Sequence, residues 1–205
     1  MIHEKNKNSL FEKFLISSVL IIFSMIFIGG LTRLTNSGLS ITEWELFTGI
    51  LPPLSYSKWQ EYFNLYKNIP QFQLINPDMS IEEFKIIFYW EYFHRILARL
   101  IGLFFLIPII YFYFSKKIEN KYMNICYLIF ILIVFQGVIG WYMVKSGLNE
   151  DITVSHYRLS IHLTIAIIII SSIFWLIKNI ISKKDKVFFY FSYDNLPFQI
   201  LILFI

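Results

Sequence analysis

Two histidines could bind a metal ion or a haem group through their imidazole rings. His94 lies in "EYFHRILARL" at the start of one long apolar stretch, and His162 lies in "VSHYRLSIHLTIAIIII" at the start of another. If both stretches cross a membrane as helices in the same direction, the two imidazoles lie at a similar depth. Neutral imidazole is a common axial ligand of haem iron, and facing helices of a four-helix bundle can supply two of them. The pair therefore predicts a haem whose iron is held by both histidines.

Small residues follow both histidines at helical spacing. Ala98 and Gly102 lie one and two turns after His94, and Ala166 lies one turn after His162. These residues would leave room for a flat group beneath each imidazole. The alternative is that both histidines only pack and form hydrogen bonds, and that the small residues mark ordinary helix contacts. The agreement between the two stretches gives the ligand interpretation the same weight as the packing interpretation, and both stay open at this point.

Charged residues surround the first histidine and precede the second. Glu91 lies one helical turn before His94, where a partly buried carboxylate could move protons beside a bound haem. An exposed pair between Glu91 and Arg95 would contribute only about 0.2–0.5 kcal/mol. Ionisable groups near a membrane boundary are instead functional candidates by default. Arg95, Arg99 and Arg158 could pair with the carboxylates of a haem or with Glu91.

A further histidine, His156, lies six residues before His162. On a helix the two side chains would point in different directions, so His156 could contact a bound haem only at its outer rim. The alternative is a histidine in a solvated loop.

The composition is that of an integral membrane protein. Of the 205 residues, 57% are hydrophobic and 20% are aromatic. The net charge of +4 comes without any nucleic-acid-binding motif, and we attribute it to lysines in cytoplasmic loops. The single cysteine, Cys126, excludes an internal disulfide and a metal site built from several cysteines.

Four apolar stretches are long enough to cross a membrane as helices. They cover residues 14–31, 93–114, 122–144 and 159–178. A fifth, "LPFQILILFI", is too short to span within this sequence. We therefore expect an all-α integral membrane protein with a four-helix transmembrane bundle. Its expected parts are a cytoplasmic tail (1–13), the haem-binding bundle (14–178) with an outer loop (32–84), a cytoplasmic linker (179–195) and the start of a fifth helix (196–205).

Lysine clusters predict the orientation of the chain. They lie in the tail, in the turn 115–121 and after the fourth span, which places the N-terminus in the cytoplasm. The outer loop is rich in acidic residues and is expected on the opposite side. Within it, Trp59, Phe63 and Tyr66 follow helical spacing. They predict a short amphipathic helix, either on the membrane surface or packed on the protein's own outer end.

Local signals predict where some helices begin and end. "SIEE" is a capping box in which Ser80 caps and Glu83 reaches back, so the second long helix should begin near Ile81. "GGLTRLTNSG" predicts a bend at the end of the first span. This stretch also resembles "QGVIGWYMVKSGL" at the end of the third span, and each precedes a histidine-bearing helix. The sequence thus predicts two repeated helix pairs, with Gly137 and Gly140 serving mainly in packing.

Several long motifs, occurring in order, resemble the haem A synthase family. They are "GGLTRLTNSGLSITEW", "TGILPPLS", "M-x-x-E-E-F-K-x-I-F-x-W-E-Y-x-H-R-x-L-x-R-L-I-G", "Q-G-x-I-G-W-x-M-V-x-S-G-L" and "V-S-H-Y-R-L-x-x-H-L". The closer resemblance is to the proteobacterial and mitochondrial branch, and it runs from about residue 16 to about residue 178. It implies an eight-span enzyme of two four-helix bundles that oxidises a ring methyl group of haem O to a formyl group. The product, haem A, serves cytochrome oxidase.

The resemblance also implies roles for residues. His94 and His162 match the pair that holds the substrate haem, and Glu91 matches the glutamate proposed as catalytic. The second bundle, with a histidine pair for a haem B cofactor, is not in this sequence, and neither is the outer-loop cysteine pair of the other branch. We assign Arg95, Arg99, Arg158 and His156 to contacts with the bound haem.

The expected setting is the bacterial inner membrane, crossed several times. Expected partners are haem O, the lipid bilayer, haem O synthase, an electron donor and further copies of the chain, but not nucleic acid. Two alternatives stay open, namely a b-type cytochrome that only transfers electrons and an inactive haem-binding half. The carboxylate of Glu91 distinguishes the enzyme from the cytochrome, because electron transfer alone does not need it.

Overall fold

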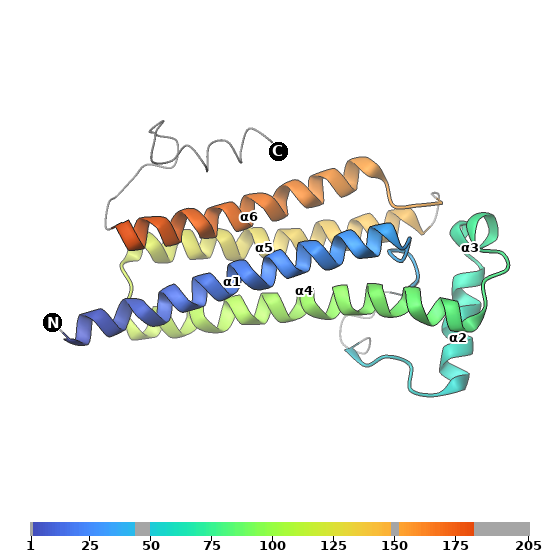
Figure 1. Ribbon diagram of the computed structural model, residues 1–205, viewed down its shortest axis with the longest axis horizontal. Coiled ribbons are helices and arrows are strands. Elements are labelled where there is room, and N and C mark those ends of the chain that lie inside the picture. The colour runs from blue at the N-terminus through green and yellow to red at the C-terminus, as the bar shows by residue number, and fades with distance from the viewer. Residues whose placement is uncertain (1, 44–49, 149–151, 183–205) are drawn as a thin grey trace. The chain divides into compact units, whose positions relative to one another are not determined.

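The computed structural model describes residues 2–43, 50–148 and 152–182 (Figure 1). Every regular element within these residues is a helix, which confirms the predicted all-α class. The predicted linker beyond residue 182 and the predicted fifth helix lie outside the described residues. The helices are α1 (Ile2–Leu34), α2 (Tyr56–Lys67), α3 (Pro70–Ile75), α4 (Ile81–Ser115), α5 (Asn120–Gly147) and α6 (His156–Ser182).

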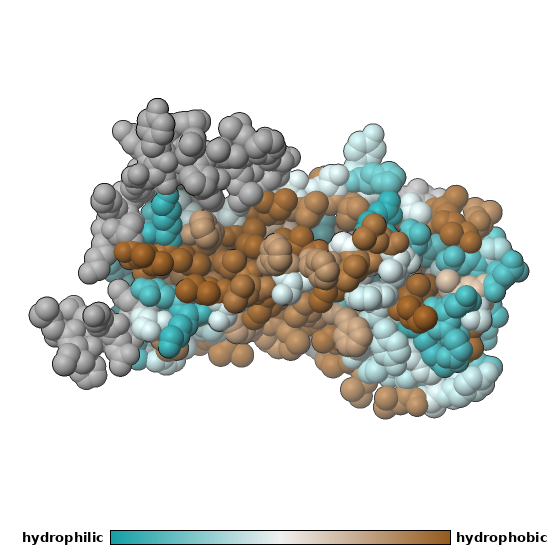
Figure 2. Space-filling view, viewed as in Figure 1, coloured by the Kyte–Doolittle hydropathy of each residue, from teal (hydrophilic) through white to brown (hydrophobic). Residues whose placement is uncertain are grey.

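Among the described residues, four helices are long and apolar enough to cross a membrane, namely α1, α4, α5 and α6. Each contains one of the predicted spans and extends past it at both ends. Between 17% and 22% of the most apolar window of each helix is buried inside the protein, so most side chains there face outward. Figure 2 shows this apolar surface along the long helices, whereas hydrophilic side chains gather over α2 and α3. The chain is a multi-pass membrane protein.

The capping box predicted before α4 is present. The Ser80 backbone N–H donates to Glu83 Oε2 at 2.8 Å, and the Glu83 N–H donates to Ser80 Oγ at 3.3 Å. These bonds satisfy two backbone donors that the first turn of a helix leaves open. The helix therefore begins at Ile81, as predicted.

The bend predicted within "GGLTRLTNSG" is present, and it lies near the end of this stretch. α1 continues through Gly29 and Gly30 and ends only at Leu34. The chain turns afterwards, at Asn36, whose φ of 51° lies in the left-handed region that asparagine tolerates better than most residues. Both glycines stay helical, and the α1 backbone at Gly29 packs against the His94 side chain of α4.

The chain divides into two compact units, and each unit takes a part of every long helix. The first unit comprises Met1–Ser24, Ile101–Gln136 and Leu163–Ile205, and the second comprises Met25–Leu100 and Gly137–His162. Within each unit the four long helices run side by side (Figure 1). The candidate site residues all belong to the second unit.

The first unit is packed by aromatic side chains of α1 and α4. Phe11 meets Phe112 edge to face with ring centroids 5.0 Å apart, and Phe14 lies 5.1 Å from Phe105. All four side chains are buried.

The second unit has a core formed by the outer loop and the first turns of α4. Trp59, Phe63 and Tyr66 of α2 are all buried, and their rings contact Phe84 and Phe88 of α4. The ring centroids of Trp59 and Phe88 are 5.0 Å apart, and those of Phe63 and Phe84 are 5.1 Å apart. The predicted amphipathic helix therefore packs on the protein's own outer end and does not lie with its apolar face on the membrane.

Candidate functional site

His94 on α4 packs against a glycine of α1. A Cβ atom built on Gly29 would lie 3.1 Å from His94 Cε1 and 3.6 Å from Nδ1. Only a residue without a side chain lets the imidazole come this close to the α1 backbone. His94 Nδ1 is buried and has no hydrogen-bond partner among the residues that the structure describes. Buried polar atoms are rarely left unpaired. Because Nδ1 lies on the ring edge that packs against Gly29, Nε2 is the nitrogen that remains to hold a ligand.

His162 on α6 stands in the same relation to α5. A Cβ atom built on Gly140 would lie 3.2 Å from His162 Cε1, with Nδ1 at 3.8 Å and Nε2 at 4.0 Å. Each histidine thus packs on a glycine of the long helix that precedes its own in the chain. The two helix pairs share this contact.

The two imidazoles lie in the same compact unit. His94 belongs to its stretch Met25–Leu100 and His162 to its stretch Gly137–His162. No group of three or more histidine, cysteine, aspartate or glutamate side chains could hold a bare metal ion within the described residues. Two imidazoles are a ligand set that would hold the iron of a haem, because the porphyrin would supply the remaining ligands. The residues present therefore fit a haem.

Glu91 is the most buried charged residue of the site, with 3% of its surface exposed. Its Oε1 accepts hydrogen bonds from Arg95 Nε at 3.0 Å and Arg95 Nη2 at 2.5 Å. Its Oε2 accepts from Ser40 Oγ at 2.7 Å and from the Ile41 backbone N–H at 2.9 Å. A buried carboxylate is costly unless such donors satisfy it. We call this set of bonds the Glu91 network.

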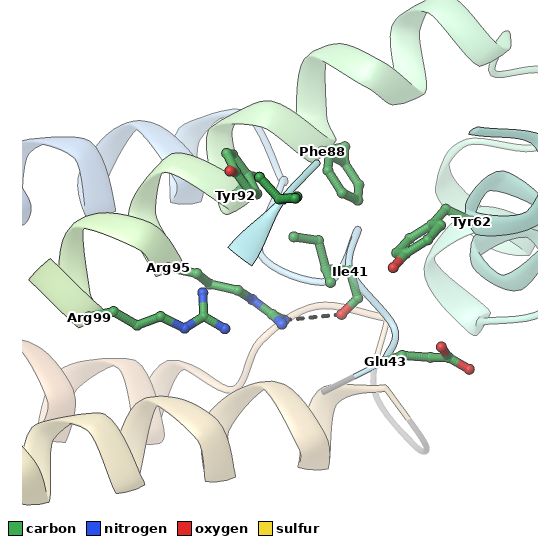
Figure 3. Close-up of a pocket in the computed structure, with 8 residues that line it drawn as sticks. Ile41, Glu43, Tyr62, Phe88, Tyr92, Arg95 and Arg99 are labelled. Atoms are coloured by element: carbon green, nitrogen blue, oxygen red, sulfur yellow. Dashed lines mark hydrogen bonds between the residues drawn. The ribbon is translucent and has the colours of Figure 1, made fainter. Parts of the chain in front are cut away.

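The Glu91 network ties α4 to the loop that follows α1. Arg95 Nη2 also donates to the Ile41 carbonyl at 3.0 Å, the bond drawn as a dashed line in Figure 3. Ser40 Oγ lies 3.3 Å from the Ile87 carbonyl. The loop is therefore fixed to α4 one helical turn from His94. No sequence signal pointed to Ser40 or Ile41, because their contacts with Glu91 join residues about fifty positions apart.

The three predicted arginines lie in different surroundings. Arg95 and Arg99 line a pocket together with aromatic rings of Phe88 and Tyr92 (Figure 3). Arg95 donates to Glu91, which is one of the two partners predicted for it, the other being a haem carboxylate. Arg158 on α6 donates to Ser146 Oγ, and its guanidinium lies 5.2 Å from the centre of the Tyr142 ring. The arginines therefore do not form one cluster around Glu91.

His156 is the first residue of α6 and not a loop residue. Its Nδ1 lies 3.2 Å from Arg33 Nη2, near the end of α1, in an exposed position. Because an arginine only donates, the histidine nitrogen accepts this bond. His156 therefore links α6 to α1 at the rim of the second unit.

The small residues that follow the histidines on their own helices do not supply the closest contacts to the imidazoles. Ala98 is exposed, and a Cβ atom built on Gly102 would meet nothing within 4 Å. The close contacts to the imidazoles come instead from Gly29 and Gly140 on neighbouring helices. Spacing along one helix could not identify them, because they lie far away in the sequence.

A second polar network, missed from the sequence, holds the outer loop. Tyr66 is fully buried, and its hydroxyl donates to Gln71 Oε1 at 3.1 Å and accepts from Asn76 Nδ2 at 2.9 Å. Gln71 Nε2 donates in turn to the Asn36 carbonyl at 3.1 Å. This chain of bonds supports the left-handed turn at Asn36 and thereby the loop that reaches Glu91.

The fold and the site define a class of protein: a multi-pass helical membrane protein in which α4 and α6 each carry a histidine packed on a glycine of another long helix. Residues 12–198 match the family described as cytochrome oxidase assembly protein. The chain belongs to this family.

Curated relatives include three bacterial proteins named heme A synthase. That of Pelagibacter ubique is 56% identical over 168 residues, covering 81% of this chain and 49% of that protein. That of Parvibaculum lavamentivorans is 46% identical over 171 residues, with coverages of 83% and 50%. That of Flavobacterium johnsoniae is 42% identical over 185 residues, with coverages of 89% and 54%. The chain spans about half the length of these relatives. No solved structure matches it.

Proposed function

We propose that this chain binds the substrate haem of a haem A synthase and presents a ring methyl group for oxidation to a formyl group. The observation that carries the proposal is the pair of imidazoles on α4 and α6, each packed on a glycine of another long helix. The similarity to proteins named heme A synthase supports the same substrate. The chain acts as the substrate half of an enzyme whose relatives are about twice as long.

Hydroxylation of a methyl C–H bond needs an oxidant that no side chain supplies, so a redox cofactor must carry that chemistry. A haem B in a second bundle, outside this sequence, is the cofactor that we expect. This chain's own residues position the substrate and handle protons. His94 and His162 hold the haem O iron, and Arg99 and Arg158 receive its carboxylates.

In this proposal Glu91 takes up protons released as the methyl group is oxidised. Both of its oxygens already accept hydrogen bonds. A proton can therefore reach it most directly through the Ser40 hydroxyl, which can accept one proton while donating its own. His156 adds a polar contact at the rim. We further propose that the chain resides in the bacterial inner membrane as a homo-oligomer, with its N-terminus in the cytoplasm, and meets haem O synthase and an electron donor there.

The first experiment tests the ligands. Residues 1–205 are purified from membranes, loaded with ferric haem and examined by visible absorption and electron paramagnetic resonance. We expect a low-spin spectrum from two imidazole ligands. His94→Ala and His162→Ala should each remove it. A wild-type chain without a low-spin signal would contradict the proposal.

The second experiment tests Glu91. A full-length protein that joins this chain to the second half of a relative is expressed in cells lacking their own haem A synthase. We expect Glu91→Gln to leave haem binding intact and to abolish haem A formation. Ser40→Ala is a companion variant, because it removes the proposed proton path and one donor to Glu91 while keeping the carboxylate. It should lower haem A formation less than Glu91→Gln does.

The same experiment separates the enzyme from a b-type cytochrome. Wild-type haem A levels in Glu91→Gln would show that the carboxylate is not needed for oxidation. If the joined wild-type protein binds low-spin haem but forms no haem A, the chain is better described as an electron-transfer cytochrome or an inactive half.

A further inference from the structure

Each helix that faces a histidine carries two glycines, and only one of the two touches the imidazole. On α1, Gly29 meets His94, whereas a Cβ atom on the adjacent Gly30 would meet nothing within 4 Å. On α5, Gly140 meets His162, whereas Gly137, nearly one turn away, is equally free of neighbours. The two glycines on each helix therefore both have helical backbones, but they differ in the side chains that surround them.

Glycine in the middle of a helix needs a reason, because alanine is the better helix former. At Gly29 the reason is visible. A methyl group there would lie 3.1 Å from His94 Cε1, closer than carbon atoms normally approach. The imidazole would have to give way by several tenths of an ångström. At Gly140 the distance to His162 Cε1 is 3.2 Å, and the same argument holds.

We propose that Gly29 and Gly140 are positioning residues that set the orientation of the two iron-binding imidazoles. This inference rests on the proposed function, since it concerns the same haem. The edge of the His94 ring nearest Gly29 is formed by Nδ1 and Cε1, and Nε2 lies farther from the glycine. The contact therefore fixes how far the ring leans toward α1. Groups that contact a metal ligand fix its orientation and thereby affect the properties of the metal. A helix backbone is a rigid surface for such a contact.

The same contact occurs twice in the second unit. In both pairs the glycine helix directly precedes the histidine helix in the chain, as α1 precedes α4 among the long helices and α5 precedes α6. "GGLTRLTNSGL" and "QGVIGWYMVKSGL" each contain a glycine that offers a bare backbone to an imidazole. A side chain on either glycine would push its histidine away from the glycine helix.

The experiment compares four alanine variants of residues 1–205 loaded with ferric haem. Gly29→Ala and Gly140→Ala are the test variants, and Gly30→Ala and Gly137→Ala are their matched controls. We expect the test variants to lose most of the low-spin signal or to shift its g values and the reduction potential. The controls should keep the wild-type spectrum, because their methyl groups meet open space. Equal spectra in all four variants would overturn the inference.

A second measurement on the haem-free protein guards against variants that only fold poorly. Gly29→Ala is made alone and together with His94→Ala, and thermal unfolding is followed by circular dichroism. Alone, the added methyl group should lower the unfolding temperature, because it collides with the ring. With His94→Ala it should raise that temperature, because only the gain in helix propensity remains. The same shift in both backgrounds would show that the contact with the imidazole is not what matters.

The two failures are distinguishable. A wild-type chain that forms no low-spin haem contradicts the proposed function. A wild-type chain that does, with test variants indistinguishable from their controls, contradicts only the role of the glycines.

Discussion

Glu91 shows how one residue can serve both structure and chemistry. Its carboxylate is buried, and four hydrogen bonds from Arg95, Ser40 and Ile41 compensate the cost of burying it. Removing one partner of a buried ion pair leaves a charge without compensation, which is usually more damaging than removing both.

Arg95→Met tests this reasoning. We expect it to destabilise the second unit by roughly 3–5 kcal/mol, because the side chains of Arg95 and Glu91 are only 11% and 4% exposed. The double variant Glu91→Gln/Arg95→Met should recover most of that loss, since an amide oxygen still accepts from Ile41. Thermal unfolding in detergent measures both. An unchanged unfolding temperature for Arg95→Met would mean that the pair contributes little.

Tyr66 gives the outer loop a dependence on pH. Burial raises the pKa of its phenol above the ordinary value of 10, although the hydrogen bond from Asn76 acts in the opposite direction. The folded loop therefore favours the neutral phenol. This contribution to stability is complete below pH 10 and is lost as the pH rises through the higher pKa of the folded state.

Tyr66→Phe should remove this dependence. The variant loses its bonds to Gln71 and Asn76, at a cost of about 1 kcal/mol near neutral pH. Between about pH 9 and about pH 12 its unfolding temperature should fall less steeply than that of the wild type. Parallel curves for the two proteins would assign the alkaline loss to other groups.

At the scale of elements, α2 is held by its aromatic face. Phe63 is buried between Phe72 and Phe84, with ring centroids 5.8 Å and 5.1 Å away. The outer loop is thus a small folded cap on α4, and its stability depends on burial of large side chains.

Phe63→Ala should loosen this cap by about 3–5 kcal/mol. Limited proteolysis of the purified protein should then cleave within the outer loop much faster. Tyr56→Ala is the control, because Tyr56 begins the same helix and is 65% exposed. Equal cleavage of the two variants would show that the aromatic contacts do not hold α2 in place.

At the scale of the whole molecule, lysine positions predict the orientation in the membrane. Cys126 is buried, so single cysteines introduced elsewhere can be labelled selectively. In whole cells permeable only at the outer membrane, Lys58→Cys on α2 should react with a charged maleimide, and Lys117→Cys should react only after lysis. The reverse pattern would invert the proposed topology.

The sequence by itself determined much of the architecture. Runs of apolar residues determine membrane helices because the hydrocarbon core leaves no other way to satisfy backbone groups, so all four spans were predictable. The start of α4 was predictable too, because Ser80 and Glu83 act within one turn. His94, His162 and Glu91 stood out because polar groups at a membrane boundary are few and need a purpose.

Only the tertiary structure decided what surrounds these residues. The donors to Glu91 come from Ser40 and Ile41, and the surfaces under the imidazoles come from Gly29 and Gly140. The sequence placed small residues one turn from His94, on its own helix, whereas the contact comes from α1. The physical reason is range: propensity and capping act over a few residues, while helix packing joins residues that only the folded chain brings together.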